Sequence, residues 1–580
     1  MVDRSACGGG ALVTAHDTAT RRDTLASLLD ELVTADPGAA AALDVVDGEP
    51  IVTSRSELRA RVDGLKSELL RVGVRRGQCV AVLLPNWSDA IVWQLAASAV
   101  GAHVIGVNTR YNTHEIAHIL TSARPAVVAV ADHFHGLDLF GRLGEAQHSL
   151  DLPAPAVAVV RGPGTTGDAP DPARFDLGGG AWTAGSADTG TVQVPVTPDM
   201  ATITAAGERA APDDVLAVAF TTSGSTGVPK LAAHRESAVV RHARADAVVL
   251  AVEPGDVTLC VLPVSGVFGY STALATLAGG GTLLMEPVFD AAVTLARMES
   301  LKVTHVVGGD DLFTRLHDTW HAGNRADLSS LKRLGIADFL GRSHEVAAWV
   351  RDEFGAVTTG VFGSSEVFAL MLLWDAADPE SLRWNGGGRP VESGIEVRIV
   401  DPLDDSVLPD GEQGELQVRG PNVVDAYLGN PDAAARAFTR DGWFRSGDLA
   451  VATGDGGYTY VCRMGDVLRL RGFLVDPAEI EHRLAEHDAV HLTKVVGITG
   501  TGGYTEAVAF VVPTEDTSAG AAELRAWCAE SLAAFKVPAA VHVIEEMPTT
   551  VGGNGAKIRA VELREWAQRW TDHERDFRSA

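Results

Sequence analysis

One segment of the 580-residue chain gathers residue types suited to holding a phosphate, Phe220-Thr-Thr-Ser-Gly-Ser-Thr-Gly-Val-Pro-Lys230. Glycines let the backbone curl so that its N–H groups point inward, hydroxyl groups add donors, and Lys230 supplies positive charge. A Walker phosphate loop requires glycine directly before its lysine, whereas this chain has Pro229 there. We therefore interpret the segment as a phosphate-binding loop of another kind, the alternative being an ordinary Ser/Gly-rich loop.

Three charged residues elsewhere have surroundings that suit nucleotide chemistry. Glu366 follows a turn of small residues, on which a carboxylate could face phosphates and bind Mg²⁺ through oxygen. Asp448 ends a Ser-Gly-Asp sequence after an aromatic strand, and its carboxylate could accept both hydroxyl groups of a ribose. Lys557 lies in a glycine-rich loop, from which it could reach an oxyanion that forms only in the transition state. Taken singly, each also has a simpler interpretation as a solvated glutamate, a turn aspartate and a surface lysine.

The segments that must position these residues alternate between helix and strand. Short apolar runs at 79–84, 103–107 and 126–130 predict buried strands, and the patterns between them predict helices at 86–100 and 113–122. This spacing is typical of a parallel sheet with crossover helices. The alternation resumes at about residue 215 and continues to about residue 400.

The later part of the chain predicts a second, smaller unit. Antiparallel strands are expected at 397–400 and 415–418, followed by turn-forming residues and then by a new alternation of helices and strands. We place a domain boundary near Met464. The expected organisation is a flexible tail, a large domain and a small α+β domain, at residues 1–22, 23–463 and 464–580.

A stretch rich in Pro, Gly, Thr and Asp at 161–214 interrupts the alternation, and we interpret it as a long surface excursion. It contains Gly162-Pro-Gly-Thr-Thr-Gly167, formally a dinucleotide-binding GxGxxG motif. Pro170 and Pro172 would interrupt the helix that such a motif needs. The motif is therefore interpreted as part of a loop.

Charge and cysteine usage exclude several classes of protein. Asp and Glu outnumber Lys and Arg by 76 to 48, and the resulting net charge of −28 argues against nucleic-acid partners and anionic membrane surfaces. The five cysteines are too scattered for a metal site or a disulfide framework, so we expect a reduced, cytoplasmic protein. No apolar run is long enough for a membrane span.

Several motifs together resemble one known family. The segment from Thr222 to Lys230 is similar to the phosphate loop of the adenylate-forming superfamily, which comprises acyl-CoA synthetases, adenylation domains and luciferases. Other matching motifs follow in the family's order, and they are Asn108-Thr-Arg-Tyr111, Phe362-Gly-Ser-Ser-Glu366, Gly414-Glu-Leu-Gln-Val-Arg-Gly-Pro421, Asp441-Gly-Trp-Phe-Arg-Ser-Gly-Asp448, the segment from Arg463 to Glu481 and Gly555-Ala-Lys557-Ile-Arg559. The resemblance spans roughly residues 25–570 and favours fatty-acyl and related carboxylic acid–CoA ligases.

This resemblance implies an α/β fold with parallel sheets in a large N-terminal domain and a small C-terminal α+β lid. It also implies two chemical steps: a carboxylic acid attacks the α-phosphate of ATP with release of pyrophosphate, and the thiol of coenzyme A then displaces AMP. Lys557, Lys230 and Mg²⁺ held by Glu366 would neutralise phosphate charge. The lid would rotate between the steps, exchanging Lys557 for the Arg471-Gly472-Phe473 segment.

The site residues that the resemblance implies fall into three groups. The first comprises the ATP-binding residues Thr222, Ser223, Gly224, Ser225, Thr226, Gly227, Lys230, Gly335, Ala337, Phe362, Gly363, Ser365, Asp448, Arg463 and Lys557. The second lines the tunnel for the acyl group and the thiol, and comprises Gly266, Val267, Phe268 and Gly472. The third is the hinge, Gly465.

Two departures from the family pattern leave alternatives open. Gly266 stands where the family usually has His or a bulky aromatic residue, which leaves space for a larger acid or a differently shaped tunnel. Gly465 replaces the usual charged hinge residue. The activated acid could instead pass to a carrier-protein thiol or an amine, or be an unusual oxyacid such as nitrite. A nucleotide-binding protein without turnover is the remaining alternative.

Overall fold

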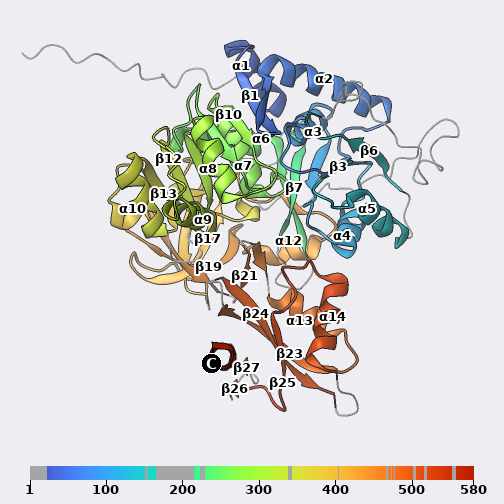
Figure 1. The fold of residues 1–580 in the computed structure, drawn as a ribbon, viewed down its shortest axis with the longest axis vertical. Coiled ribbons are helices and arrows are strands. Elements are labelled where there is room, and N and C mark those ends of the chain that lie inside the picture. The colour runs from blue at the N-terminus through green and yellow to red at the C-terminus, as the bar shows by residue number, and fades with distance from the viewer. Residues whose placement is uncertain are drawn as a thin grey trace, which may run out of the picture.

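The computed structural model describes residues 23–579, apart from 133, 151–153, 165–213, 223–228, 338–342, 403, 465–467, 472, 476, 501–503, 515–518 and 551–556. Most of the excursion expected at 161–214, namely residues 165–213, therefore lies outside the described residues. The chain forms a large α/β domain and a smaller C-terminal lid beneath it (Figure 1). No helix in the described ranges is long and apolar enough to cross a membrane.

One sheet of the large domain contains the parallel strands that the apolar runs predict. Strands β3, β4 and β5 are parallel neighbours, and helices α3 (Ser88–Ala99) and α4 (Thr113–Ala123) connect them. Their buried, β-branched sequences suit a sheet that is covered on both faces. In spatial order the strands are β18 (Ala426–Tyr427), β8 (Lys230–Arg235), β7 (Leu216–Thr222), β4 (His103–Gly106), β3 (Cys79–Leu83), β5 (Val127–Ala131) and β6 (Ala156–Val160).

A second, longer sheet runs from a parallel centre to antiparallel ends. Strands β10, β9, β11, β12 and β13 are parallel, whereas β16, β17, β19 and β20 pair antiparallel, including the expected pairing of 397–400 with 415–418. In spatial order its strands are β16 (Glu396–Val400), β17 (Gln413–Arg419), β19 (Phe444–Ala452), β20 (Tyr458–Arg463), β15 (Gly387–Pro390), β14 (Leu372–Leu373), β13 (Val357–Phe362), β12 (Arg333–Ala337), β11 (His305–Gly309), β9 (Val257–Cys260), β10 (Thr282–Met285), β1 (Ala40–Val46) and β2 (Glu49–Ser54).

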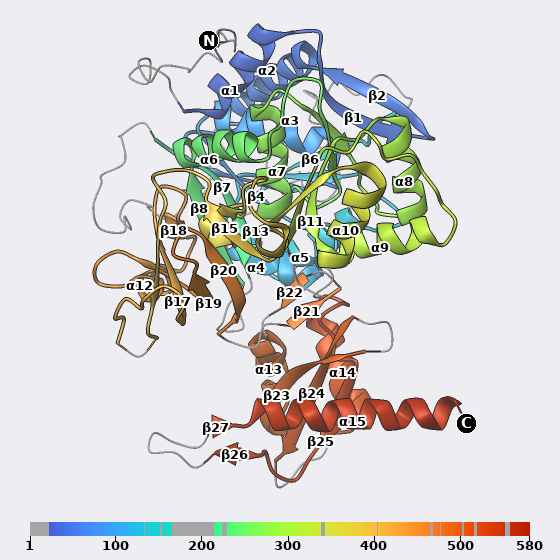
Figure 2. The ribbon, with the colours of Figure 1, turned by 90° about the vertical axis from the view of Figure 1, so that its left-hand side faces the viewer.

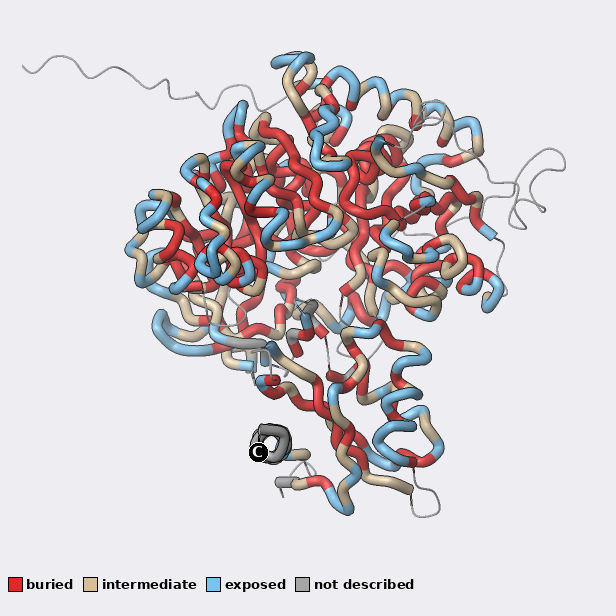
Figure 3. The backbone as a smooth tube through the Cα atoms, in the orientation of Figure 1, coloured by how far each residue is buried: buried red, intermediate tan, exposed pale blue. Residues whose placement is uncertain are grey.

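Helices pack against these two sheets and connect their strands. The remaining helices of the large domain are α1 (Leu25–Ala35), α2 (Arg55–Arg71), α5 (Leu139–His148), α6 (Glu236–Val249), α7 (Val267–Ala278), α8 (Ala291–Ser300), α9 (Asp310–His321), α10 (Ser343–Phe354), α11 (Glu380–Arg383) and α12 (Pro431–Ala437). Figure 3 shows that buried backbone is concentrated in the centre of this domain.

The lid has its own small sheet, on which helices pack. Strands β23 (Val490–Thr499) and β24 (Thr505–Pro513) are antiparallel, and β25 (Ala540–Val543) adds a parallel edge. Its other elements are the hairpin of β21 (Leu468–Leu470) and β22 (Phe473–Val475), helices α13 (Pro477–Ala485), α14 (Ala521–Ser531) and α15 (Ala560–Ser579), and strands β26 (Thr549–Thr550) and β27 (Lys557–Ile558). Among the residues that the structure describes, the apolar clusters of the lid contain lid residues alone, and those of the large domain contain none from the lid.

Candidate active site

The predicted phosphate loop joins two antiparallel strands. β7 ends at Thr222 and β8 begins at Lys230, and these two residues are paired across the hairpin. The residues expected at its tip, Ser223, Gly224, Ser225, Thr226 and Gly227, lie outside the described residues. Thr222 is 8% exposed, and its Oγ1 has no hydrogen-bond partner within the described residues. A hydroxyl group is thus available at the base of the loop.

Helix α4 (Thr113–Ala123) and the segment just before it contact the two ends of this hairpin. Before the loop, the hydroxyl of Tyr111 lies 2.6 Å from Oγ1 of Thr221. After the loop, Nε2 of His118 lies 2.8 Å from the carbonyl oxygen of Pro229. The helix begins with a capping box, in which the side chains of Asn112 and Glu115 accept each other's backbone N–H groups. One end of the loop is therefore contacted by the segment that leads into α4, and the other end by α4 itself.

Glu366 lies in a short 3₁₀ turn, Ser365–Val367, and is partly exposed. The hydroxyl of Tyr427 donates to its Oε1 at 3.1 Å, and the Nζ of Lys230 lies 5.1 Å from the centre of the same tyrosine ring. Tyr427 thus links the predicted metal ligand to the predicted phosphate-binding cation. Sequence reasoning missed Tyr427, because the pairing of β18 with β8 that brings it here spans almost 200 residues.

The Glu366 turn is held by hydrogen bonds from two neighbouring segments. Burial lowers the pKa of His234 to about 4, so its ring is neutral and Nε2–H donates to the carbonyl of Ser365 at 2.7 Å. The backbone N–H of Val424 donates to the carbonyl of Glu366 at 2.6 Å. Gly363 precedes the turn, and a Cβ there would lie 1.7 Å from the carbonyl oxygen of Ala369. The carboxylate is therefore presented from a backbone that leaves no room for a side chain at position 363.

Three of the expected ATP-binding residues lie on two neighbouring strands. Gly335 and Ala337 are in β12, and Phe362 ends β13, which is its parallel neighbour. The ring of Phe362 packs 5.4 Å from the ring of Tyr460, with an angle of 32° between the planes. Carboxyl ends of parallel strands are the usual place for a ligand in such sheets. This placement makes Phe362 both a packing residue and a candidate ligand contact.

Asp448 lies within β19 rather than after a strand, so the simpler interpretation as a turn aspartate does not hold. It is 4% exposed, its backbone N–H donates to Oγ of Ser446 at 3.0 Å, and its cross-strand neighbour is Arg463 of β20. β20 also carries Tyr460, so Arg463 and the ring that packs on Phe362 share one strand. A buried carboxylate on a paired strand is rigidly placed, which suits a binding role.

The candidate tunnel residues Gly266, Val267 and Phe268 begin helix α7. Gly266 is the N-cap, with φ at −108°, and an added Cβ would meet only the carbonyl oxygen of Pro263, at 3.5 Å. A Cβ on Gly106 would lie 2.2 Å from the carbonyl oxygen of Ser265, so this loop packs directly on β4. Position 266 therefore accepts a side chain without backbone strain. The expected hinge Gly465 and the tunnel residue Gly472 lie outside the described residues.

Lys557 was expected in a mobile loop, but its backbone forms the short strand β27, paired with Thr550 of β26. Figure 2 shows this pair at the end of the lid away from the large domain, whereas the hairpin β21–β22 faces that domain. The predicted catalytic lysine and Glu366 are thus carried by separate parts of the molecule in this arrangement. A rotation of the lid is needed to bring β27 toward the large domain.

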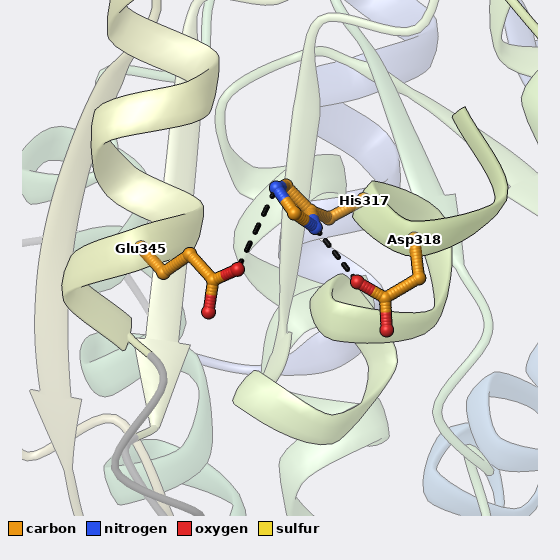
Figure 4. A group of neighbouring side chains, drawn as sticks. All are labelled: His317, Asp318 and Glu345. Atoms are coloured by element: carbon orange, nitrogen blue, oxygen red, sulfur yellow. Dashed lines mark hydrogen bonds and ion pairs between the residues drawn. The ribbon is translucent and has the colours of Figure 1, made fainter. Parts of the chain in front are cut away.

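A further group that could hold a metal ion lies on α9 and α10, at His317, Asp318 and Glu345 (Figure 4). Nδ1 of His317 is 2.8 Å from Asp318 and Nε2 is 3.8 Å from Glu345, but both carboxylates are largely exposed. Glu366 is not in this group. The single, partly exposed carboxylate of Glu366 nevertheless suits Mg²⁺, because this ion usually takes one or two protein carboxylates together with substrate phosphates.

Comparison with known proteins identifies the family. Residues 29–428 match the family model described as AMP-binding enzyme, and residues 479–554 match that of the AMP-binding enzyme C-terminal domain. The chain belongs to the AMP-binding enzyme family. The second match lies wholly within the lid, so both parts of this AMP-binding enzyme correspond to known components of the family.

Relatives of known activity span nearly the whole chain. A 3-[(3aS,4S,7aS)-7a-methyl-1,5-dioxo-octahydro-1H-inden-4-yl]propanoyl:CoA ligase of Rhodococcus jostii is 31% identical over 522 residues, covering 88% of this chain and 94% of the relative. A 2-hydroxy-7-methoxy-5-methyl-1-naphthoate–CoA ligase of Streptomyces carzinostaticus is 30% identical over 544 residues, covering 92% of this chain and 91% of the relative. The amide bond synthetase McbA of Marinactinospora thermotolerans has a similar structure, with a TM-score of 0.73 and 26% identity, covering 93% of this chain and 99% of that one.

Proposed function

We propose that this AMP-binding enzyme is an ATP-dependent carboxylic acid–CoA ligase that works through an acyl-adenylate. The observation on which the proposal rests is the arrangement of Glu366, Tyr427 and Lys230 beside the stem of the phosphate loop. In this arrangement, a carboxylate that would hold a cation lies near an ammonium that would bind phosphate oxygens. Relatives of similar length that are named as CoA ligases support the choice of acceptor.

The proposed reaction has two balanced steps. In the first, a carboxylate oxygen bonds to the α-phosphorus of ATP, and the bond between the α-phosphorus and the bridging oxygen breaks to release pyrophosphate. In the second, the thiol sulfur bonds to the carbonyl carbon, the bond to AMP breaks, and the thiol proton is released. Glu366 would hold Mg²⁺, which supplies positive charge against the phosphates when bound. Lys230 would bind the departing phosphates, and Lys557 would stabilise charge at the α-phosphate.

The other predicted residues have supporting roles in this proposal. Asp448 and Arg463 would bind the ribose, whereas Gly335, Ala337 and Phe362 would flank the adenine. In this proposal the large domain spans residues 23–463, the lid spans residues 464–580, and Gly465 is the hinge between them. A reducing cytoplasm would suit the buried, free thiols Cys79, Cys260 and Cys528.

We infer that the acid carries a ring system. Gly266 leaves the start of α7 open, and the named acids of the two sequence relatives are bicyclic. The test is a panel of bicyclic, monocyclic and straight-chain acids, scored for pyrophosphate release with and without coenzyme A and for product mass. Acyl-CoA formed fastest from a cyclic acid supports the proposal. Pyrophosphate release without acyl-CoA at any coenzyme A concentration contradicts it.

A second candidate is amide formation, because the fold matches an amide bond synthetase over almost all of both chains. In that case an amine nitrogen, rather than a thiol sulfur, would attack the acyl-adenylate. The same panel distinguishes the two functions when amines are added in place of coenzyme A. An amide product whose yield exceeds that of the thioester would favour this candidate.

A further inference from the structure

One buried group of charges joins the lid to the large domain. Nζ of Lys536, in the lid, lies 2.8 Å from Oε1 of Glu115 in α4 and 2.8 Å from Oε1 of Glu479 in α13. All three side chains are less than 10% exposed. The Nδ2 of Asn112 also donates to the carbonyl oxygen of Ser531 across the same boundary, at 2.6 Å. The contact is therefore a small, buried, hydrogen-bonded patch rather than a loose surface ion pair.

The two carboxylates around Lys536 have different relations to the lid. Glu479 moves with Lys536, because both belong to the lid, and their contact is independent of lid rotation. Glu115 belongs to the large domain, so its contact with Lys536 exists only while the lid is docked as seen here. Burial acts to lower the pKa of Lys536, but the two carboxylates outweigh it and raise that pKa. Lys536 is therefore charged while the contact is made.

In this docked orientation, the two ends of the lid lie at different distances from the large domain. The hairpin β21–β22 faces that domain, and β27 with Lys557 lies at the far end (Figure 2). An enzyme that needs Lys557 near the α-phosphate in its first step cannot perform that step in this orientation. Glu115 also sits in α4, whose His118 lies 2.8 Å from the carbonyl oxygen of Pro229 at the end of the phosphate loop. The contact thus lies on the element that joins the lid to the nucleotide site.

We propose that Glu115 is a positioning residue that selects the lid orientation for the thiol-transfer step by pairing with Lys536. The inference rests on the proposed two-step function. Breaking the pair leaves the lid free to turn and expose both charges to water, whereas re-forming it stabilises the orientation seen here. A buried pair with good geometry is costly to break by removal of one partner. The proposal therefore assigns Glu115 an effect on one half-reaction and not on the other.

The test uses Glu115→Gln, which keeps an amide oxygen for the capping box but removes the charge. Adenylation is measured as the single-turnover release of pyrophosphate without coenzyme A. Thiol transfer is measured as acyl-CoA formed from a chemically prepared acyl-adenylate and coenzyme A. We expect thiol transfer to slow at least about tenfold, within the range usual for coupling between sites. Adenylation should be unchanged or faster, because the competing orientation is less populated.

Two further variants separate positioning from a loss of structure. Lys536→Met should have the same effect on the ratio of the two rates. Lys494→Met removes a comparable ion pair, 2.8 Å from Glu481, that lies entirely inside the lid, and should leave the ratio unchanged. Equal loss of both half-reactions in Glu115→Gln, or an unaltered thiol-transfer rate, would overturn the inference. A wild-type enzyme that makes no acyl-CoA from any adenylate would overturn the proposed function, and this inference with it.

Discussion

At the scale of single residues, Tyr427 explains how opposite charges are arranged at the site. Its ring faces the ammonium of Lys230 and its hydroxyl donates to Glu366. Cation–π attraction and a hydrogen bond to a carboxylate are each worth about 1 kcal/mol or more when partly buried. One aromatic side chain therefore orients both groups that are proposed to handle phosphates.

Tyr427→Phe tests this orientation, because it removes the hydrogen bond to Glu366 and keeps the ring beneath Lys230. We expect pyrophosphate release to slow about fivefold, corresponding to about 1 kcal/mol. Rapid-quench measurement of the first turnover would show it. Tyr458→Phe is the matched control, because that hydroxyl donates to the carbonyl of Val397, away from the site. Equal rates for the two variants would contradict the assigned role.

Gly266→His tests the space at the start of α7. Its Cβ has room, so the variant should fold, and the imidazole should narrow the space proposed for the acid. We expect kcat/KM to fall for bicyclic acids and to change less for small ones, while the KM for ATP is unaltered. A uniform change across all acids would show that position 266 does not contact the substrate.

At the scale of elements, the strands and helices of the parallel regions were predictable because each buried strand is a local apolar run. The predicted strands at 79–84, 103–107 and 126–130 agree with β3, β4 and β5 within a residue or two. Local periodicity does not encode pairings between distant strands, so it missed that β1 and β2 extend the long sheet and that β18 joins β8. For the same reason, local periodicity did not predict that Tyr427 lies at the site or that Asp448 lies within a strand.

Lys557→Ala tests the role of the far end of the lid. Because β27 lies away from the large domain in the docked orientation, thiol transfer from a supplied acyl-adenylate should be retained. Adenylation should fall by about 10²–10³, as for removal of one group that stabilises an oxyanion. Separate assays of the two half-reactions would show this, and wild-type pyrophosphate release by the variant would rule out Lys557 as the catalytic lysine.

At the scale of the whole molecule, buried titratable groups make stability depend on pH. Burial lowers the pKa of His103 and His234 to about 4 and that of His242 to about 3. Each therefore stays neutral in the fold while the unfolded chain takes up a proton near pH 6.5, and stability is lost as pH falls from about 6.5 to about 4. Burial raises the pKa of Asp44 and Asp425 to about 6, which has the opposite sign and favours the fold as pH falls from about 6 to about 4.

His103→Gln should remove the proton that the unfolded chain takes up at position 103. Between pH 6 and pH 5, the free energy of unfolding of the variant should fall less steeply than that of the wild type, by about 1 kcal/mol per pH unit. Urea titrations of the large domain at several pH values would measure the two slopes. Parallel slopes would show that folding does not lower the pKa of His103.

The separate apolar clusters of the two domains have a thermodynamic consequence for the turning of the lid. Exposure of apolar surface to water is what gives unfolding its large heat capacity change. Since the clusters of the lid and of the large domain share no residues, a change of lid orientation uncovers the polar patch around Lys536 and leaves both clusters intact. The heat capacity change of the rotation should therefore be close to zero. The balance between the two orientations should then follow a straight van 't Hoff line over a temperature range in which the stability of the fold itself is strongly curved.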